Sequence, residues 1–369
     1  MTVAIIGAGA SGCICTYYLL KKGIDVTLFD TGSPLRTLLP TGGGRCNLAH
    51  AEYDFKELAK NYPRGEKFLY SVFSQFSTSD TIAMFDELGV KTYTQENGRI
   101  FPVSNSAKDV REQILKAIKK ASIIKENVDK IQPLECGYKL ITNNAKYFFD
   151  TVVIAIGGKG RLKGLNHKII PKAPSLVGLN CENTEFSGVV LKNVYSKDCK
   201  INGDLLFTHF GISGPLVYTI SSIKAREEFP YKLNFDLYPS ELDLQSIMNS
   251  NPHKELKNIL SDIYPRRFAE YIAGNFAEAK AHTINGKTRD LILDKIHNFE
   301  LNITGTNKGE ETVTAGGFDL NEIKPKTMES KIHPNLYIIG EALDIDGFCG
   351  GFNLQNAWST AFVAAKAIE

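Results

Sequence analysis

The pattern of apolar and polar residues at the start of the chain predicts a strand, a glycine turn, a helix and a second strand. A run of apolar and β-branched residues covers Thr2–Ile6, and the glycine-rich turn GAGASG follows at residues 7–12. Cys13–Lys22 then has the apolar face of an amphipathic helix, and a second apolar run, Asp25–Phe29, ends at Asp30. This order of elements is typical of a dinucleotide-binding βαβ unit.

The next hundred residues mix helices with short strands. Apolar positions at helical spacing predict helices within Phe55–Leu88 and over Ala107–Ala121. Alternating apolar and polar residues then predict a three-stranded meander that leads into a buried strand, with segments at Ile123–Ile131, Tyr138–Thr142, Lys146–Phe149 and Thr151–Ile156.

The pattern changes in the middle of the chain. From Ile169 to about Leu237 we expect short β segments between Gly and Asn turns, interrupted by a helix that starts at the sequence SGP of residues 213–215. Helices are expected over Glu241–Asn298, and strands resume afterwards at Phe299–Thr304 and Glu311–Thr314. The chain ends with an apolar strand at 336–339, a loop rich in Gly and Asp, and a helix over Asn353–Ile368.

Composition and charge narrow the possible classes of protein. The chain has 369 residues, 43% hydrophobic and 23% charged, as in ordinary globular proteins. Its net charge of +2 gives no reason to expect a nucleic acid or an anionic membrane as a partner. Seven cysteines without a CxxC pair suit a reducing compartment, and no apolar run is long enough for a membrane span. We expect a cytoplasmic protein and make no prediction of its oligomeric state.

The first glycine turn has the residues needed to bind a dinucleotide. Gly7 permits the tight turn, Gly9 lets the backbone touch a pyrophosphate, and Gly12 lets the helix and strand pack closely. The N–H groups at the start of the helix, at Ala10 and Ser11, favour an anion. Asp30 lies eighteen residues after Gly12, where an acid binds the ribose hydroxyls. The alternative is a glycine turn that binds nothing.

A second glycine cluster indicates which dinucleotide binds. GGGRCN at residues 42–47 follows Arg36, at a point where a plain NAD-binding fold would continue into another helix and strand. Successive glycines allow close approach to an extended ligand, and Arg and Asn side chains can donate hydrogen bonds to it. We therefore predict FAD as the cofactor, unless this segment is merely a polar loop. The predicted contacts are Arg36, Gly43, Gly44, Arg45, Cys46 and Asn47, together with the backbone of Val128 at the adenine.

These motifs, with two more, resemble a known family. GAGASG at 7–12, GGGRCN at 42–47, TAGGFDL at 314–320 and GEALDIDGFCGGFNLQNAW at 340–358 are similar to the bacterial BaiN-like or YhiN-like flavoproteins, also described as an aminoacetone oxidase family of FAD-binding enzymes. The similarity covers nearly the whole chain. The chain departs from the family pattern at Ile156, where a Thr is usual before the paired glycines, and in a short loop at 159–168.

The resemblance implies further cofactor contacts near the C-terminus. Gly340 and Glu341 would form the second FAD motif, with the carboxylate on the ribityl hydroxyls. Gly157 would follow a strand of the same site. The start of the last helix, at Gly351, Phe352, Asn353 and Leu354, would point its N–H groups at the pyrimidine side of the flavin.

Catalytic residues are harder to predict. Asp344 and Asp346 are our candidates for orienting a substrate amine or relaying a proton, although both also suit a capped turn. The loop lacks the side-chain oxygens of a calcium site, so we predict no metal. We interpret Cys349 as a packed small residue and His209 as structural.

The predicted fold is α/β, with an FAD domain of the two-dinucleotide-binding-fold type that is Rossmann-like and interrupted by an insertion. Residues 1–168 and 312–369 form the two parts of the FAD domain. The inserted substrate-side domain covers 169–311, β-rich at 169–238 and 299–311 and helical at 239–298.

We predict an FAD-dependent oxidoreductase that acts on a small organic substrate by hydride transfer to or from flavin N5. Reductase and amine or amino-acid oxidase both remain open. NAD(P)H is a possible transient electron donor, but the sequence has no second nucleotide motif for it. The alternatives are an FAD-binding protein with a structural or regulatory role and a tRNA-modifying flavoprotein.

Overall fold

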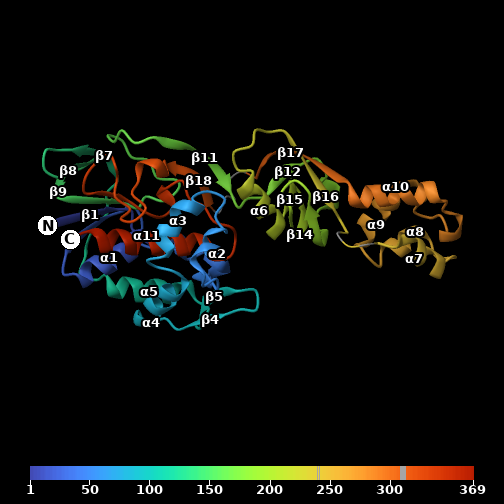
Figure 1. Cartoon of the computed structure of the whole chain (residues 1–369), viewed down its shortest axis with the longest axis horizontal. Helices are drawn as coiled ribbons and strands as arrows, with labels where there is room; N and C mark the ends of the chain where they lie inside the picture. Colours follow the sequence, from blue (N-terminus) through green and yellow to red (C-terminus); the bar gives the residue numbers. More distant parts are fainter. Residues whose placement is uncertain (239, 241, 308–312) are drawn as a thin grey trace. The chain divides into compact units, whose positions relative to one another are not determined.

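The computed structural model describes residues 1–238, 240, 242–307 and 313–369, and these form two compact units (Figure 1). The first unit consists of Met1–Ala173 and Val313–Glu369, and the second of the described residues from Pro174 to Asn307. Some predicted bounds lie outside the described residues. They are the domain boundaries at 239, 311 and 312, the first residue of the predicted helical region at 241, and the start of the predicted strand at 311–314.

A five-stranded parallel sheet forms the centre of the first unit. Its central strand and one neighbour, Thr2–Ile6 and Thr151–Ile154, are almost wholly apolar and buried, as expected when helices cover both faces of a parallel sheet. The order is β19 (Leu336–Ile338), β10 (Thr151–Ile154), β1 (Thr2–Ile6), β2 (Asp25–Phe29) and β6 (Ser122–Ile124). The first and last of the described strands, β1 and β19, therefore belong to one sheet.

Helices α1 (Ala10–Lys21) and α11 (Phe352–Ala367) pack against each other beside this sheet (Figure 1). Small residues of α11, including Ala361 and Ala364, are fully buried and permit this close packing. Trp358 is also fully buried, and its Nε1 donates to Leu48 O at 2.9 Å. That hydrogen bond holds Leu48, the residue after the second glycine cluster, against α11.

The predicted meander differs from the structure at its first strand. The predicted segment at 123–131 divides into β6, which pairs with β2 in the parallel sheet, and β7 (Val128–Pro133). The antiparallel sheet consists of β7, β8 (Tyr138–Thr142) and β9 (Lys146–Phe149). The polar residues at 125–127 separate the two strands.

A small antiparallel sheet and short helices complete the first half of this unit. The sheet has the order β3 (Ala49–His50), β5 (Arg99–Pro102) and β4 (Thr92–Thr94). The helices are α2 (Phe55–Ala59), α3 (Glu66–Phe73), α4 (Thr78–Glu87) and α5 (Ala107–Ala117). β18 (Val313–Phe318) pairs with β11 (Ile169–Ser175).

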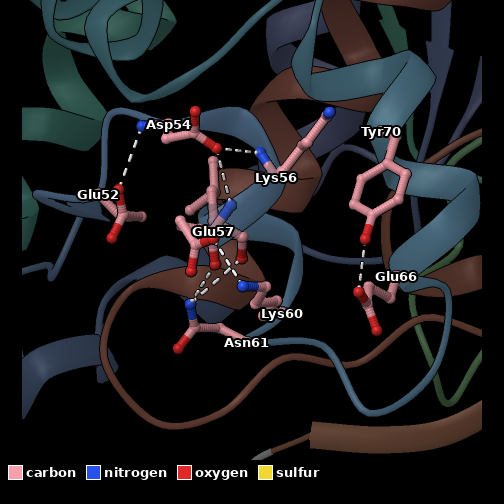
Figure 2. Close-up of polar contacts among 9 residues, drawn as sticks. Glu52, Asp54, Lys56, Glu57, Lys60, Asn61, Glu66 and Tyr70 are labelled. Atoms are coloured by element: carbon pink, nitrogen blue, oxygen red, sulfur yellow. Dashed lines mark hydrogen bonds and ion pairs between the residues drawn. The ribbon is translucent and has the colours of Figure 1, made fainter.

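The start of α2 shows why these short helices begin where they do. The Asp54 carboxylate accepts hydrogen bonds from the N–H groups of Lys56 and Glu57, which have no partner within the helix (Figure 2). In α3, Tyr70 donates to Glu66 one turn earlier (Figure 2).

The second unit contains a closed β-barrel with helices inserted between its strands. The barrel order is β12 (Leu179–Cys181), β15 (Gly211–Ser213), β14 (Ile201–Thr208), β13 (Val190–Ser196), β16 (Tyr231–Asp236) and β17 (Phe299–Thr306). α6 (Pro215–Ile223) begins at the SGP sequence, where a proline suits the first helical position. The remaining helices are α7 (Leu244–Ser250), α8 (Leu256–Leu260), α9 (Arg266–Ala273) and α10 (Gly286–His297).

Candidate functional site

The first glycine turn is packed on one side and open on the other. Gly7 has a φ of 107°, and a Cβ there would lie 2.2 Å from Ala155 O. A Cβ on Gly12 would lie 1.9 Å from Gly7 O, so β1, α1 and β10 require both glycines for packing. A Cβ on Gly9, by contrast, would have no atom within 4 Å. The backbone before α1 is therefore accessible, and the first N–H groups of the helix lack helical partners.

The carboxylate of Asp30 is fixed against this turn. One oxygen accepts from Ala8 N at 2.8 Å and the other from Gly32 N at 2.7 Å. A carboxylate oxygen can accept a second hydrogen bond, so Asp30 keeps the capacity to bind hydroxyl groups. The exposed Arg36 guanidinium is close by, with Cζ 3.5 Å from the Cβ position of Gly32.

The second glycine cluster forms a left-handed turn. Gly42, Gly43 and Gly44 have φ values of 57°, 68° and 84°. A Cβ on Gly43 would meet no atom within 4 Å, which leaves room for a ligand. Arg45 stacks on Phe101, with Cζ 4.2 Å from the ring centre.

Two buried side chains beside this cluster differ in chemistry. Cys46 is fully buried, and burial raises the pKa of its thiol to about 12, so it packs as a neutral side chain. Asn47 Oδ1 is buried and has no hydrogen-bond partner. A buried amide oxygen without a partner costs free energy, and a bound donor group would relieve that cost.

The C-terminal motif meets the N-terminal one at the end of β19. Gly340 has a φ of 66°, and a Cβ there would lie 2.6 Å from Ser11 Oγ. The N–H of Gly340 donates to Thr360 Oγ1 of α11 at 3.0 Å. Segments more than 300 residues apart in the sequence are thus in contact.

Glu341 is held by backbone donors beside the same strand end. Its Oε1 accepts from Thr314 N at 2.8 Å and would lie 2.7 Å from a Cβ on Gly158. Burial raises the pKa of the Glu341 carboxyl above its ordinary value, although the N–H groups of Thr314 and Gly158 oppose the shift. The neighbouring Gly157 has a φ of 67° and open space at its Cβ position.

The loop before α11 is held in place by several hydrogen bonds. Asn353 accepts from Gly347 N and donates to Gly347 O, both at 2.8 Å. Tyr62 donates to Phe352 O at 2.6 Å. Gly351 has a φ of 102°, and a Cβ there would lie 2.4 Å from Ala49 O. Contact with β3 therefore accounts for this glycine.

The two candidate catalytic acids occupy different environments. Asp346 is fully buried and forms a two-bond ion pair with Arg64, in which Nη2 and Oδ2 are 2.5 Å apart. Asp344 accepts from Gly316 N at 3.0 Å and lines an open depression of about 420 Å³. Asp346 is thus enclosed and paired, whereas Asp344 borders open space; their predicted catalytic roles stay predictions, and we propose a positioning role for Asp346.

The structure brings the first glycine turn, Asp30 and the second predicted FAD motif together. Gly7–Gly12, Asp30, Gly340 and Glu341 surround the carboxyl ends of β1, β2, β10 and β19, where ligands bind in open α/β sheets. Val128 is buried at the start of β7 and pairs with Thr142, and its predicted contact with the adenine stays a prediction. His209 is exposed and belongs to the second unit.

Sequence reasoning missed His50, Arg99 and Asn356. His50 and Arg99 face each other across β3 and β5, and His50 Nδ1 donates to Gly350 O at 3.2 Å. Asn356 is buried, its Oδ1 has no partner, and it shares a face of α11 with Thr360. A two-residue strand and a polar residue inside a helix give no recognisable motif, so no signal in the sequence identified them.

These features fit a bound dinucleotide. The open backbone at Gly9 and Gly43 and the unpaired oxygen of Asn47 lie in the segments predicted to contact it. Among the described residues, no cluster of His, Cys, Asp and Glu suits a metal ion, and no helix has the length and apolar character of a membrane span.

Similar proteins of known family also indicate a flavoprotein. The profile of the HI0933-like protein Rossmann domain family matches residues 1–367. The ribosomal RNA dihydrouridine synthase of Haemophilus influenzae is 31% identical over 400 residues, covering 99% of this chain and 98% of the relative. The 3-dehydro-bile acid delta(4,6)-reductase of Clostridium scindens is 26% identical over 412 residues, covering 99% and 98%.

A solved structure shows the same fold. Sdh1 of Mycobacterium smegmatis in the apo form has a TM-score of 0.50 and 14% identity, covering 99% of this chain and 67% of that chain. The matches confirm the predicted resemblance, the Rossmann-like α/β fold and the predicted class of flavin-dependent oxidoreductases.

Proposed function

Because the chain belongs to the HI0933-like protein Rossmann domain family, we propose that it is an FAD-dependent reductase of carbon–carbon double bonds conjugated to a carbonyl group. The observation that carries the FAD-binding part of this proposal is the contact between Gly340 and Ser11, which joins the two predicted FAD motifs at an accessible helix start. FAD, when bound and reduced by an electron donor, would supply the hydride.

The residues of the first unit suit the parts of FAD. The free N–H groups at the start of α1 would bind the pyrophosphate, since the positive end of a helix dipole attracts phosphate. Asp30 would accept from the ribose hydroxyls and Glu341 from those of the ribityl chain. Asn47 would accept from an N–H group of the flavin.

The names of two relatives favour reduction over oxidation. A dihydrouridine synthase and a 3-dehydro-bile acid delta(4,6)-reductase both saturate a double bond near a carbonyl group. We retain a small organic molecule as the leading substrate, because the chain has a net charge of only +2. The 31% identity with the first relative supports a uracil base in RNA as the second candidate. NAD(P)H remains the proposed electron donor.

The proposal predicts that the FAD-loaded protein, once reduced under anaerobic conditions, is reoxidised by a conjugated ketone. Stopped-flow absorbance of the flavin would measure this with a 3-oxo-Δ4 steroid, with unmodified ribosomal RNA and with the saturated steroid as control. Reoxidation by the unsaturated steroid alone favours the small-molecule reductase, and reoxidation by RNA alone favours the second candidate. If neither the steroid nor the RNA reoxidises the flavin, the proposal is contradicted. If, in addition, an amine reduces the flavin and air then reoxidises it with formation of peroxide, the result favours an oxidase.

A further inference from the structure

We propose that Arg99 binds the carbonyl oxygen of the substrate beside the loop that precedes α11. The inference rests on the proposed function, because it assigns one group of the substrate of that reaction to a named side chain. Arg99 lies in the first unit, on β5, and belongs to none of the sequence motifs discussed above.

The register of the small sheet determines which side chains surround Arg99. His50 of β3 lies directly opposite Arg99 of β5, so both side chains are on one face of the sheet. Phe101 follows Arg99 by two residues and shares that face, because strand side chains alternate. A cation, an imidazole and a buried aromatic ring therefore lie on one face of the sheet.

This face contacts both predicted flavin-binding loops. Arg45 of the second glycine cluster stacks on Phe101, with Cζ 4.2 Å from the ring centre. His50 donates to Gly350 O at 3.2 Å, and Arg99 Nη2 lies 3.9 Å from Cys349 Sγ. Arg99 is thus held at the loop whose following helix is predicted to face the flavin pyrimidine.

The guanidinium of Arg99 has no carboxylate partner among the described residues. Within residues 1–238, 240, 242–307 and 313–369, neither Arg99 nor Arg45 forms an ion pair, although both are half-buried. Arg64, in the same unit, shows the contrasting arrangement, since Asp346 neutralises it. Two half-buried guanidinium groups without a carboxylate create a positive potential that favours a bound oxyanion.

The loop beside Arg99 is fixed before any ligand binds. Asn353 makes two hydrogen bonds to Gly347, and Tyr62 bonds to the carbonyl of Phe352. The ring of His50 stacks on Phe352 at 4.7 Å between ring centres. A donor held on such a support stabilises developing charge with little reorganisation.

The reaction needs such a donor. When a hydride adds to the β carbon of a conjugated carbonyl compound, the π electrons of the double bond move toward oxygen and an enolate forms. The enolate then takes a proton from water at the α carbon, which completes the addition of two hydrogens. Arg99 would donate hydrogen bonds to the oxygen while it carries the negative charge, and the bond strengthens as the charge develops.

Binding of 4-nitrophenolate tests this role without turnover. The probe is a planar oxyanion whose own absorbance reports both binding and protonation. We expect the FAD-loaded wild type to bind the phenolate and to lower the pKa of the bound nitrophenol. Arg99→Gln should weaken binding at least tenfold and abolish the pKa shift, because a charge-assisted hydrogen bond is lost. The phenolate affinity of Arg99→Lys should lie between those of the wild type and Arg99→Gln.

The matched control is Lys91→Gln, which also removes one positive charge near the small sheet but takes it from an exposed pair with Asp86. It should bind the phenolate as the wild type does. Flavin content and the flavin spectrum of each variant verify that its site has formed. Unchanged phenolate binding in Arg99→Gln, or no binding by the wild type, would overturn the inference even if the protein reduces a conjugated ketone. Failure of the wild type to reduce any conjugated carbonyl compound would instead overturn the proposed function.

Discussion

Single glycines in the two predicted binding segments meet different neighbours. A Cβ on Gly9 would enter open space, whereas a Cβ on Gly351 would lie 2.4 Å from Ala49 O. Contact with the protein backbone accounts for the second glycine, and we propose that a bound ligand accounts for the first. The sequence could not separate these roles, because both residues occur in a glycine-rich loop before a helix.

This difference predicts opposite effects of two substitutions. Gly9→Val should change the free energy of unfolding by no more than about 1 kcal/mol but abolish FAD binding. Gly351→Val should destabilise the FAD-free protein by roughly 1–3 kcal/mol or more, because of its left-handed φ and the contact with β3. Urea unfolding and FAD titration measure both effects. Full FAD affinity in Gly9→Val would refute the assignment.

The buried ion pair of Asp346 makes a second residue-scale prediction. Asp346→Asn leaves the Arg64 guanidinium without its counterion, which should lower the free energy of unfolding by about 3–5 kcal/mol. Urea unfolding of the FAD-free protein measures this loss. A small stability change in Asp346→Asn would argue against the positioning role of Asp346.

If Asp344 is catalytic, Asp344→Asn should slow reoxidation of the reduced flavin more than it alters the free energy of unfolding.

Glu341 should make stability depend on pH. Burial raises its pKa in the folded state, so the folded state retains a proton that the unfolded state has released. The contribution of Glu341 is therefore most favourable below its unfolded pKa of about 4.3 and declines as the pH rises toward the raised folded value. Glu341→Gln should remove this decline. Unfolding free energies of the FAD-free wild type and variant across pH 4–8 test the sign, and parallel curves would contradict it.

At the scale of elements, prediction succeeded where the signal is local. The N-terminal strand and helix and the final helix follow from apolar spacing, and the turn between the first two follows from its glycines. The division of residues 123–131 into β6 and β7 could not be predicted from the sequence, because β6 forms only by pairing with β2, almost a hundred residues earlier. The two-residue strand β3 was missed for the same reason, and with it the placement of His50 opposite Arg99.

Helix α11 packs against α1, which follows the first glycine cluster, and bonds to Leu48, which follows the second. Removing this bond should therefore affect both stability and FAD binding. Trp358→Phe keeps an aromatic ring in the core but removes the hydrogen bond to Leu48 O. The buried carbonyl would lose its partner, at a cost of about 1–3 kcal/mol. We expect weaker FAD binding as well, since Leu48 adjoins the GGGRCN segment. FAD titration and urea unfolding of this variant measure both, and Phe85→Leu, which alters the ring packed on Trp358 but not the hydrogen bond, is the comparison.

For the whole molecule, the predicted fold class is confirmed, and the chain divides into two compact units. The closed barrel of the second unit was expected only as short β segments, because closure depends on pairing β12 with β17 across more than a hundred residues. The substrate-side role of that unit remains a prediction, as does the cytoplasmic location.

The central claim is that the N-terminal and C-terminal segments together bind one FAD molecule. A crystal structure of the FAD complex tests it most directly. The account predicts the pyrophosphate at the N–H groups that begin α1, a ribose at Asp30 and the ribityl chain at Glu341. FAD bound elsewhere on the chain, or a site formed without Gly9 and Glu341, would contradict the account.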